Sequence, residues 1–278
     1  MLEILQYGFM QRALLAGIII GILCPSIGIF IVLRRMSLIG DSLSHVALAG
    51  VAAGILAGVY PISMSLIFSV VAALAIEKLR KSYEEYAELS IAIILSAGIG
   101  LAVVLISLAK SFNIDLLGYL FGSITTVLPR DLWIITILGI LIIITIKFLY
   151  KELFYIAFDE VSAKLAGIPV SYINLLFIIL IASTITLSMR IVGILLVSSL
   201  MILPVATSLQ LAKSFKHATI LSIVFAQVAI ISGIFIAYYL ELASGGTIVL
   251  ISVMILLIVL GIKRLNRYLL RRKVLGTS

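Results

Sequence analysis

The sequence predicts an all-α, polytopic membrane protein with about eight or nine transmembrane helices. Of its 278 residues, 63% are hydrophobic and 12% are charged, and the mean hydropathy is +1.33. Soluble proteins carry about 25% charged residues. Apolar runs of about 18 or more residues recur along the chain, and each can cross a hydrocarbon core about 30 Å thick. A membrane barrel is excluded, because its strands would give alternating segments of about 10 residues.

Nine apolar runs are candidate spans of one transmembrane domain that covers residues 1–278. The first run ends in "IVLRR" without a small-residue cleavage site, so we interpret it as a retained helix and not as a signal peptide. The run 116–127 is too short to span and is expected to be re-entrant or interfacial. The nine spans are roughly 13–33, 41–60, 62–79, 89–109, 132–150, 171–189, 191–212, 218–240 and 246–262.

The basic residues orient these spans. With the C-terminal "KRLNRYLLRRK" in the cytoplasm and nine alternating spans, 16 of the 20 Lys and Arg residues fall at cytoplasmic ends and four at outer ends. Because cytoplasmic loops carry the excess of Lys and Arg, we expect an outside N-terminus. A model with eight spans and an interfacial N-terminal segment is the alternative. This topology explains the net charge of +8 without a nucleic-acid partner.

The longest hydrated loop on the cytoplasmic side is "KELFYIAFDEVSAKLAGIPV", residues 151–170. Asp159 and Glu160 suit the start of a short helix and Gly167 suits its end, since acidic residues favour a helix amino terminus and glycine favours the position after the last turn. The chain contains no nucleotide-binding P-loop pattern. We therefore expect a transport component and not an enzyme, with any ATP hydrolysis on a separate chain.

One ionisable pair lies inside the apolar sequence. In "GDSLSHVALAGVAAGILAG", residues 40–58, Asp41 opens a span and His45 follows one helical turn later. Residues i and i+4 share a helix face, and an ionisable residue in a membrane helix is costly unless it is paired or faces water. A carboxylate and an imidazole suit Zn²⁺, Mn²⁺ or Fe²⁺. We interpret the pair as two ligands of a weak site, from which a transported ion can leave.

The pair alone does not complete a metal site. A tetrahedral site needs two more ligands, from water, another helix or a second copy of the chain. Ala49 and Ala53 continue the same face between glycines, which lets another helix approach closely or leaves a narrow path. The competing interpretation makes Asp41 a helix N-cap and His45 a donor to a backbone carbonyl. From the spacing alone, both interpretations stay open.

A second irregular stretch, "RIVGILLVSSLMILPVATSLQLAK", places Pro204 within a span near Ser198, Ser199 and Thr207. Proline removes a backbone hydrogen bond, and nearby hydroxyls can satisfy the freed carbonyl. These four residues are candidates for lining a transport pathway, although kinks also occur for packing. The stretch "ELASGGTIVL", residues 241–250, indicates a tight turn before the last span.

Four stretches together resemble the membrane-spanning permease of metal-ion ATP-binding-cassette (ABC) importers, the zinc, manganese and iron group. The resemblance covers essentially the full chain, with the stretches in the same order. They are "RRMSLIGDSLSHVALAGVA" (34–52), "FDEVSAKLAGI" (158–168), "VGILLVSSLMILPVATS" (192–208) and "SGGTIVL" (244–250).

The resemblance implies a complex of two permease copies and two cytoplasmic ATPase subunits in the lipid bilayer of a bacterial inner (plasma) membrane. An extracellular binding protein would deliver the metal, and no cofactor would be bound permanently. Asp41 and His45 would coordinate the ion, and a two-fold axis could bring two such pairs together. The segment 157–170 would be a cytoplasmic coupling helix that docks onto the ATPase. Its expected coupling residues are Phe158, Asp159, Glu160, Ala163, Gly167 and Ile168.

Metal identity and two other protein classes remain as alternatives. The pair fits zinc and manganese alike, and "DSLSHVALAG" looks slightly more like the zinc members, with manganese next. A secondary, proton-coupled metal transporter would use Asp41 and His45 without an ATPase. That class predicts more intramembrane acids or an inverted repeat, and the sequence contains neither. A scaffold protein predicts that replacing Asp41 and His45 leaves activity intact.

Overall fold

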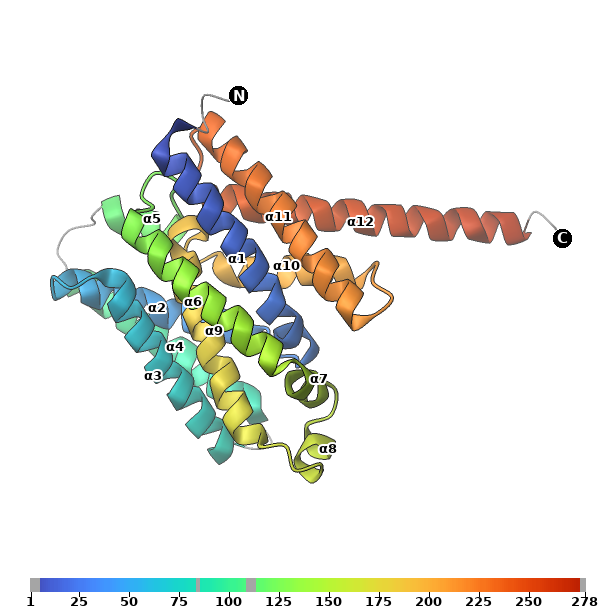
Figure 1. Cartoon of the computed structure of the whole chain (residues 1–278), viewed down its shortest axis with the longest axis horizontal. Coiled ribbons are helices and arrows are strands. Elements are labelled where there is room, and N and C mark those ends of the chain that lie inside the picture. The colour runs from blue at the N-terminus through green and yellow to red at the C-terminus, as the bar shows by residue number, and fades with distance from the viewer. Residues whose placement is uncertain (1–5, 84–85, 109–113, 276–278) are drawn as a thin grey trace.

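The computed structural model describes residues 6–83, 86–108 and 114–275, and every regular element within these ranges is a helix (Figure 1). The helices are α1 (Gly8–Leu33), α2 (Leu38–Leu56), α3 (Pro61–Ser82), α4 (Ala87–Leu108), α5 (Ile114–Phe121), α6 (Pro129–Phe148), α7 (Tyr150–Phe158), α8 (Glu160–Leu165), α9 (Val170–Val192), α10 (Val197–Leu209), α11 (Phe215–Tyr239) and α12 (Ser244–Leu275).

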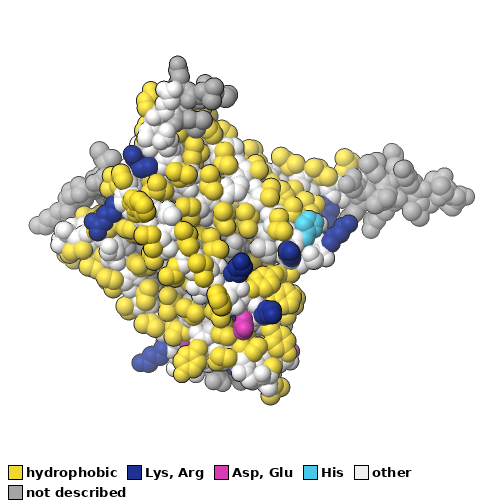
Figure 2. All heavy atoms as spheres, viewed as in Figure 1, with side chains coloured by type: hydrophobic (Ala, Val, Ile, Leu, Met, Phe, Trp, Pro, Cys, Tyr) yellow, Lys and Arg dark blue, Asp and Glu magenta, His cyan; other side chains and the backbone are white. Residues whose placement is uncertain are grey.

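Eight of the described helices are long and apolar enough to cross a membrane, namely α1, α2, α3, α4, α6, α9, α11 and α12. Three of them form the interior: 67% of the spanning window of α1 and 72% of those of α2 and α9 are buried, against 22% in α4 and 28% in α6. The peripheral helices expose large apolar side chains, and hydrophobic atoms cover most of the face in Figure 2. The predicted all-α, polytopic membrane fold is confirmed.

Two polar clusters mark opposite ends of the bundle. Glu160 at the start of α8 lies 4.0 Å from Arg34 after α1 and 3.9 Å from Arg80 in the last turn of α3. At the other end, Asp131 in the first turn of α6 lies 3.4 Å from Arg190 in the last turn of α9. Hence α1, α3 and α6 run toward the Arg34 end, and α9 runs away from it. We call this end the basic end, and the positive-inside rule assigns it to the cytoplasm.

The single span expected over 191–212 is wrong. Helix α9 continues to Val192 and ends at Gly193, whose φ of +85° is left-handed. Residues 193–196 are not α-helical, and α10 has only 13 residues, about 20 Å at 1.5 Å per residue. Residues 193–210 nevertheless connect the outer end of the bundle to the basic end. Ile194 N–H donates to the Tyr119 carbonyl (2.8 Å), and Lys263 Nζ donates to the Gln210 carbonyl (2.9 Å).

The helix break belongs to a close backbone contact among three segments. A Cβ on Gly193 would lie 2.4 Å from the Leu120 carbonyl oxygen, and one on Gly122 would lie 2.2 Å from that of Ile191. A Cβ on Gly245 would lie 1.7 Å from the Val192 carbonyl oxygen. We call Gly122, Gly193 and Gly245 the glycine junction. The tight turn expected around "SGG" is therefore mainly a packing site, which joins the start of α12 to the end of α9.

Candidate metal centre and coupling segment

Asp41 lies inside the first turn of α2 and not at its cap. The N-cap position is Ser37, and Asp41 is the fourth helical residue. Ser198 Oγ, from the first turn of α10, donates a hydrogen bond to Asp41 Oδ1. The backbones are close at this point, because a Cβ on Gly40 would lie 3.1 Å from the Ser198 Cβ. The N-cap interpretation is therefore wrong, and so is the expected start of the span at residue 41.

His45 lies one turn further along α2. Both Asp41 and His45 are partly exposed, whereas the three residues between them are buried. The two side chains therefore share the one face of this helical turn that other parts of the chain leave open. Gly98 of α4 packs beside this turn, since a Cβ there would lie 3.0 Å from the Val46 nitrogen. The residues around the pair are thus fixed by packing, while the pair itself stays accessible.

The small residues that follow the pair pack against α3. A Cβ on Gly50 would lie 2.5 Å from the Ser65 Cα, and one on Gly54 would lie 2.9 Å from the Pro61 Cα. Of the two roles that the sequence left open, these glycines serve close helix approach. Their contact holds α2 against α3 along the half of α2 that lies beyond the ligand pair.

One chain supplies an incomplete ligand set. Among the described residues, no group of three or more His, Cys, Asp or Glu side chains is placed to hold a metal ion. Asp41 and His45 provide one carboxylate and one imidazole, and the Ser198 hydroxyl lies on the carboxylate. Zn²⁺ needs four ligands and Mn²⁺ takes more. A metal held by Asp41 and His45 would therefore need ligands from outside this set.

The pathway candidates of α10 divide into two groups. Ser198 contacts Asp41, and Ser199 beside it is partly exposed. Pro204 and Thr207 are buried, and Thr207 Oγ1 donates to the Leu203 carbonyl at 2.8 Å. The carbonyl that Pro204 leaves without its helical donor is that of Leu200, so this hydroxyl satisfies a different group. The structure brings only Ser198 to the ligand pair, and it places Pro204 and Thr207 inside the packed chain.

The predicted short cytoplasmic helix is present as α8. Asp159 caps its start, accepting from the Ser162 N–H at 2.9 Å, and these hydrogen bonds lower the pKa of the exposed carboxyl. Gly167 ends it with φ +82°, and the Ile168 N–H donates to the Ala163 carbonyl at 3.1 Å. This pairing is the Schellman arrangement. Ala163 is buried and anchors the helix.

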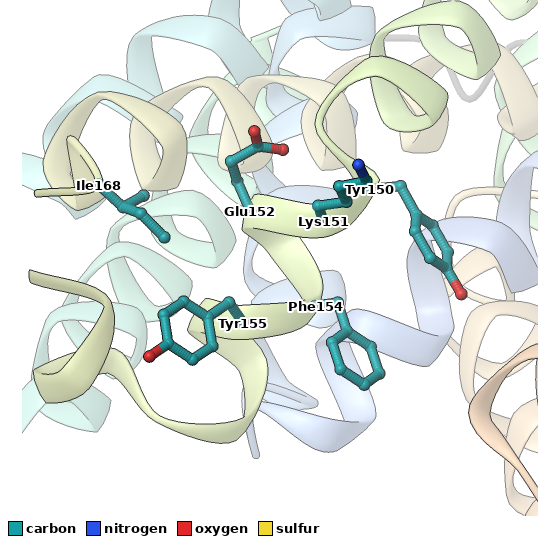
Figure 3. A pocket seen from close by; sticks show the side chains of 6 residues that line it. All are labelled: Tyr150, Lys151, Glu152, Phe154, Tyr155 and Ile168. Carbon is teal, nitrogen blue, oxygen red and sulfur yellow. The ribbon is translucent and has the colours of Figure 1, made fainter. Parts of the chain in front are cut away.

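Part of the solvent-exposed surface of this segment is apolar. The exposed fractions are 63% for Phe158, 69% for Val161 and 84% for Leu165. Phe158 packs against Phe154 of α7, with their ring centroids 4.7 Å apart. Residues of α7 and Ile168 line an open pocket of about 530 Å³, and Phe154 and Tyr155 are among its lining side chains (Figure 3). These apolar side chains lie at the basic end, beyond the buried helices, where a partner protein can cover them.

Glu160 links α8 to three spanning helices. Its carboxylate lies near Arg34 and Arg80, and it accepts from Asn174 Nδ2 of α9 at 3.4 Å. Arg34 Nη2 in turn donates to Asn174 Oδ1 at 2.6 Å. Burial lowers the pKa of Arg34 to about 10, with repulsion from Arg80 as the next cause, so Arg34 stays charged at neutral pH. From the sequence, these arginines were interpreted only as signals of membrane topology. Their contact with Glu160 becomes visible only in the folded structure.

A second buried ion pair, at the outer end, was also missed. Asp131, fully buried, accepts hydrogen bonds from the Leu128 N–H at 2.9 Å and from the Tyr60 hydroxyl. It also forms an ion pair with Arg190, whose Nε lies 3.4 Å from Asp131 Oδ2. Arg190 also lies over the Tyr119 ring, 4.3 Å from its centroid. The cluster joins the starts of α3 and α6 to the end of α9. The sequence placed Asp131 at a span end without a partner.

Comparison with known proteins identifies relatives along the whole chain. The model of the ABC 3 transport family matches residues 6–263. A probable metal transport system membrane protein of Treponema pallidum is 39% identical over 263 residues, which cover 95% of this chain and 98% of the relative. The manganese import system permease protein ScaB of Streptococcus gordonii is 35% identical, with 96% of each chain covered.

A solved structure has the same fold. It is PsaBC from Streptococcus pneumoniae in complex with a Fab, which matches with a TM-score of 0.82 and 34% identity. The match covers 93% of this chain and 93% of the solved chain.

Proposed function

The chain belongs to the ABC 3 transport family, and from this membership we propose that it is the permease subunit of an ABC importer for a divalent transition metal. It is a multi-pass protein of the bacterial plasma membrane. The observation that carries the proposal is the partly exposed Asp41 and His45 pair inside an otherwise apolar bundle, because only an ion or another chain justifies such a pair there.

We favour manganese as the cargo. The Streptococcus gordonii relative is a manganese import permease by name and shares 35% of its residues with this chain. The expectation of zinc from "DSLSHVALAG" has no support from the names of these relatives. A carboxylate and an imidazole accept both ions, so the ligands beyond the pair and the supply of metal set the choice.

A second permease copy completes the site in this proposal. One chain offers two metal ligands on an open face, and hydrocarbon cannot solvate a carboxylate and an imidazole. A two-fold axis beside α2 would cover that face and supply two carboxylates and two imidazoles. The isologous contact also explains why the pair stays accessible in the single chain.

The partners dock at opposite ends. We assign the α8 segment to contact with two cytoplasmic ATPase subunits. Its exposed apolar side chains would touch the ATPase directly, and other residues of the segment would hold it in shape. The residues assigned to these two roles are Phe158, Asp159, Glu160, Ala163, Gly167 and Ile168. In this arrangement the extracellular binding protein delivers the metal at the end that carries Asp131 and Arg190. The secondary, proton-coupled transporter is the less favoured alternative, because it leaves the α8 surface without a partner.

Metal uptake tests the proposal. Cells that express this chain with its ATPase and binding protein should take up Mn²⁺ faster than Zn²⁺, and His45→Ala should abolish uptake at an unchanged membrane level of the protein. An ATPase partner with an inactivated nucleotide site should give the same loss. Uptake that continues without a working ATPase would establish the secondary transporter instead.

A further inference from the structure

A groove on the membrane-facing side lies between α1, α6 and α11 near the basic end. Its volume is about 670 Å³, and Ile22 of α1, Ile143 of α6 and Ile223 of α11 form its apolar part. At its basic end the lining changes to Lys147, in the last turn of α6, and Lys151 of α7. We call this the α6–α11 groove. Figure 2 shows this apolar face, with basic side chains near the level of α7.

The change from apolar to basic lining coincides with the membrane boundary. Lys147 lies one residue before the end of a spanning helix, at the end of the bundle that the positive-inside rule assigns to the cytoplasm. Lipid phosphates lie at this depth, and long lysine side chains reach toward them while their stems stay on apolar surface. Basic pockets between transmembrane helices on the cytoplasmic side are binding sites for anionic lipid headgroups.

A second apolar pocket on the membrane face provides a comparison. It has a volume of about 320 Å³, lies between α2, α3 and α4, and is lined only by apolar residues such as Ile67, Val71 and Leu101. Such a pocket can hold any acyl chain and cannot distinguish headgroups. The α6–α11 groove combines an acyl-sized apolar floor with two ammonium groups on successive helical turns.

We propose that the α6–α11 groove binds an anionic phospholipid of the cytoplasmic leaflet, with its phosphate at Lys147 and Lys151 and an acyl chain along Ile143 and Ile223. Glu152 also lines the groove, and one of its carboxylate oxygens is buried without a hydrogen-bond partner. The net lining charge is thus +1, from two lysines and one glutamate. A headgroup with hydroxyls, such as phosphatidylglycerol, satisfies both the lysines and that oxygen.

The size of the preference follows from the charges. Each lysine near a membrane surface contributes about 1 kcal/mol toward anionic lipid, which is about fivefold in binding. With one net positive charge, phosphatidylglycerol should bind about fivefold more tightly than phosphatidylcholine. Glu152→Gln should raise this ratio by roughly fivefold. Lys147→Ala with Lys151→Ala leaves only the negative charge of Glu152 in the groove and should reverse the preference.

Tryptophan quenching tests the proposal in the full chain. Trp133 is the only tryptophan and is replaced by Phe, and Ile143→Trp then reports on the groove in bilayers that contain brominated lipid. Leu141→Trp is the matched reporter, because Leu141 lies two residues away on the same helix, is 54% exposed and is not part of the groove. Brominated phosphatidylglycerol should quench the Ile143→Trp reporter about fivefold more effectively than brominated phosphatidylcholine, and both lipids should quench the Leu141→Trp reporter equally.

A second measurement tests the proposal even where a tryptophan variant fails to fold. Native mass spectrometry of the chain without tryptophan substitutions should find phosphatidylglycerol retained. The lipid should be lost in Lys147→Ala/Lys151→Ala and retained in Lys147→Arg/Lys151→Arg. Lys164→Ala/Lys213→Ala, at the same end and outside the groove, should retain it. Equal quenching of both reporters by both lipids, or equal lipid retention by all four proteins, would overturn the proposal without bearing on metal uptake.

Discussion

Ser198 donates a hydrogen bond to the carboxylate of Asp41, 157 residues away in sequence. The contact joins the first turn of α10 to the first turn of α2, the helix that carries both candidate ligands. The hydrogen bond orients the Asp41 carboxylate, and it brings the helix that follows the break at Gly193 next to the Asp41 and His45 pair.

Ser198→Ala should weaken metal binding. The substitution removes a hydrogen bond to a charged group, which is worth about 1.5–3 kcal/mol, so the metal concentration at half-maximal uptake should rise by roughly tenfold or more. Radioactive Mn²⁺ uptake at several concentrations measures it. Ser232→Ala serves as control, because the Ser232 hydroxyl donates to the Val228 and Ala229 carbonyls of its own helix α11. An unchanged concentration dependence in Ser198→Ala would remove Ser198 from the site.

Glu160→Gln should separate ATP hydrolysis from transport. Glu160 connects α8 to Arg34, which lies four residues before α2, and to Arg80 of α3. In the proposed coupling role, Glu160 transmits a movement of α8 to these helices through its charge, so metal uptake per ATP hydrolysed should fall several-fold in the reconstituted complex. Lys164→Ala is the control, since its ion pair with Glu160 stays within α8.

A charge exchange tests whether the ion pair itself transmits the movement. Glu160→Arg combined with Arg80→Glu should restore part of the coupling that Glu160→Arg alone loses. If the double variant is no better than the single one, Glu160 acts by another route.

Gly245→Ala should prevent folding, whereas Gly246→Ala should be tolerated. A Cβ on Gly245 would lie 1.7 Å from the Val192 carbonyl oxygen and 2.6 Å from that of Phe121, while a Cβ on Gly246 meets open space. Backbone atoms cannot move aside as a flexible side chain can. The amount of monodisperse protein after detergent extraction measures the difference. Equal yields of Gly245→Ala and Gly246→Ala would show that the backbone at the glycine junction can move to make room for a Cβ.

Asp131→Ala should destabilise the bundle by about 3–5 kcal/mol, because it leaves the Arg190 charge without its buried partner. The melting temperature in detergent measures the loss, with the exposed Glu88→Ala as the control. Removing both partners, in Asp131→Leu with Arg190→Leu, should cost less than the sum of the single changes. Additive losses would indicate that the two side chains do not interact.

Acid should loosen the start of α8. Because hydrogen bonds from Ser162 lower the pKa of Asp159, this carboxyl stabilises the helix fully above its ordinary value of 3.8. That stabilisation is lost as the pH falls through the lower pKa of the folded state. Hydrogen exchange of the α8 amides between about pH 5 and about pH 3 should show it, after correction for the intrinsic exchange rate. Asp159→Asn should lack the pH dependence.

Apolar length and charge position were enough to predict the eight long spans, their alternation and the short helix capped by Asp159 and Gly167. The sequence could not place the break at Gly193, because the residues around it form one continuous apolar run. The break follows from a backbone contact with Leu120, more than 70 positions earlier. The Asp41 and His45 pair was visible from its spacing, whereas Ser198, Arg34 and Arg190 acquired their partners only through packing between distant helices.

Two helix amino termini meet at Asp41, because it lies in the first turn of α2 and its partner Ser198 lies in the first turn of α10. Each amino terminus carries roughly half a positive charge. These partial charges attract the carboxylate, and they also repel a bound cation. In the proposed metal site, this repulsion would shorten the residence time of the ion, so the site would favour fast release over tight storage.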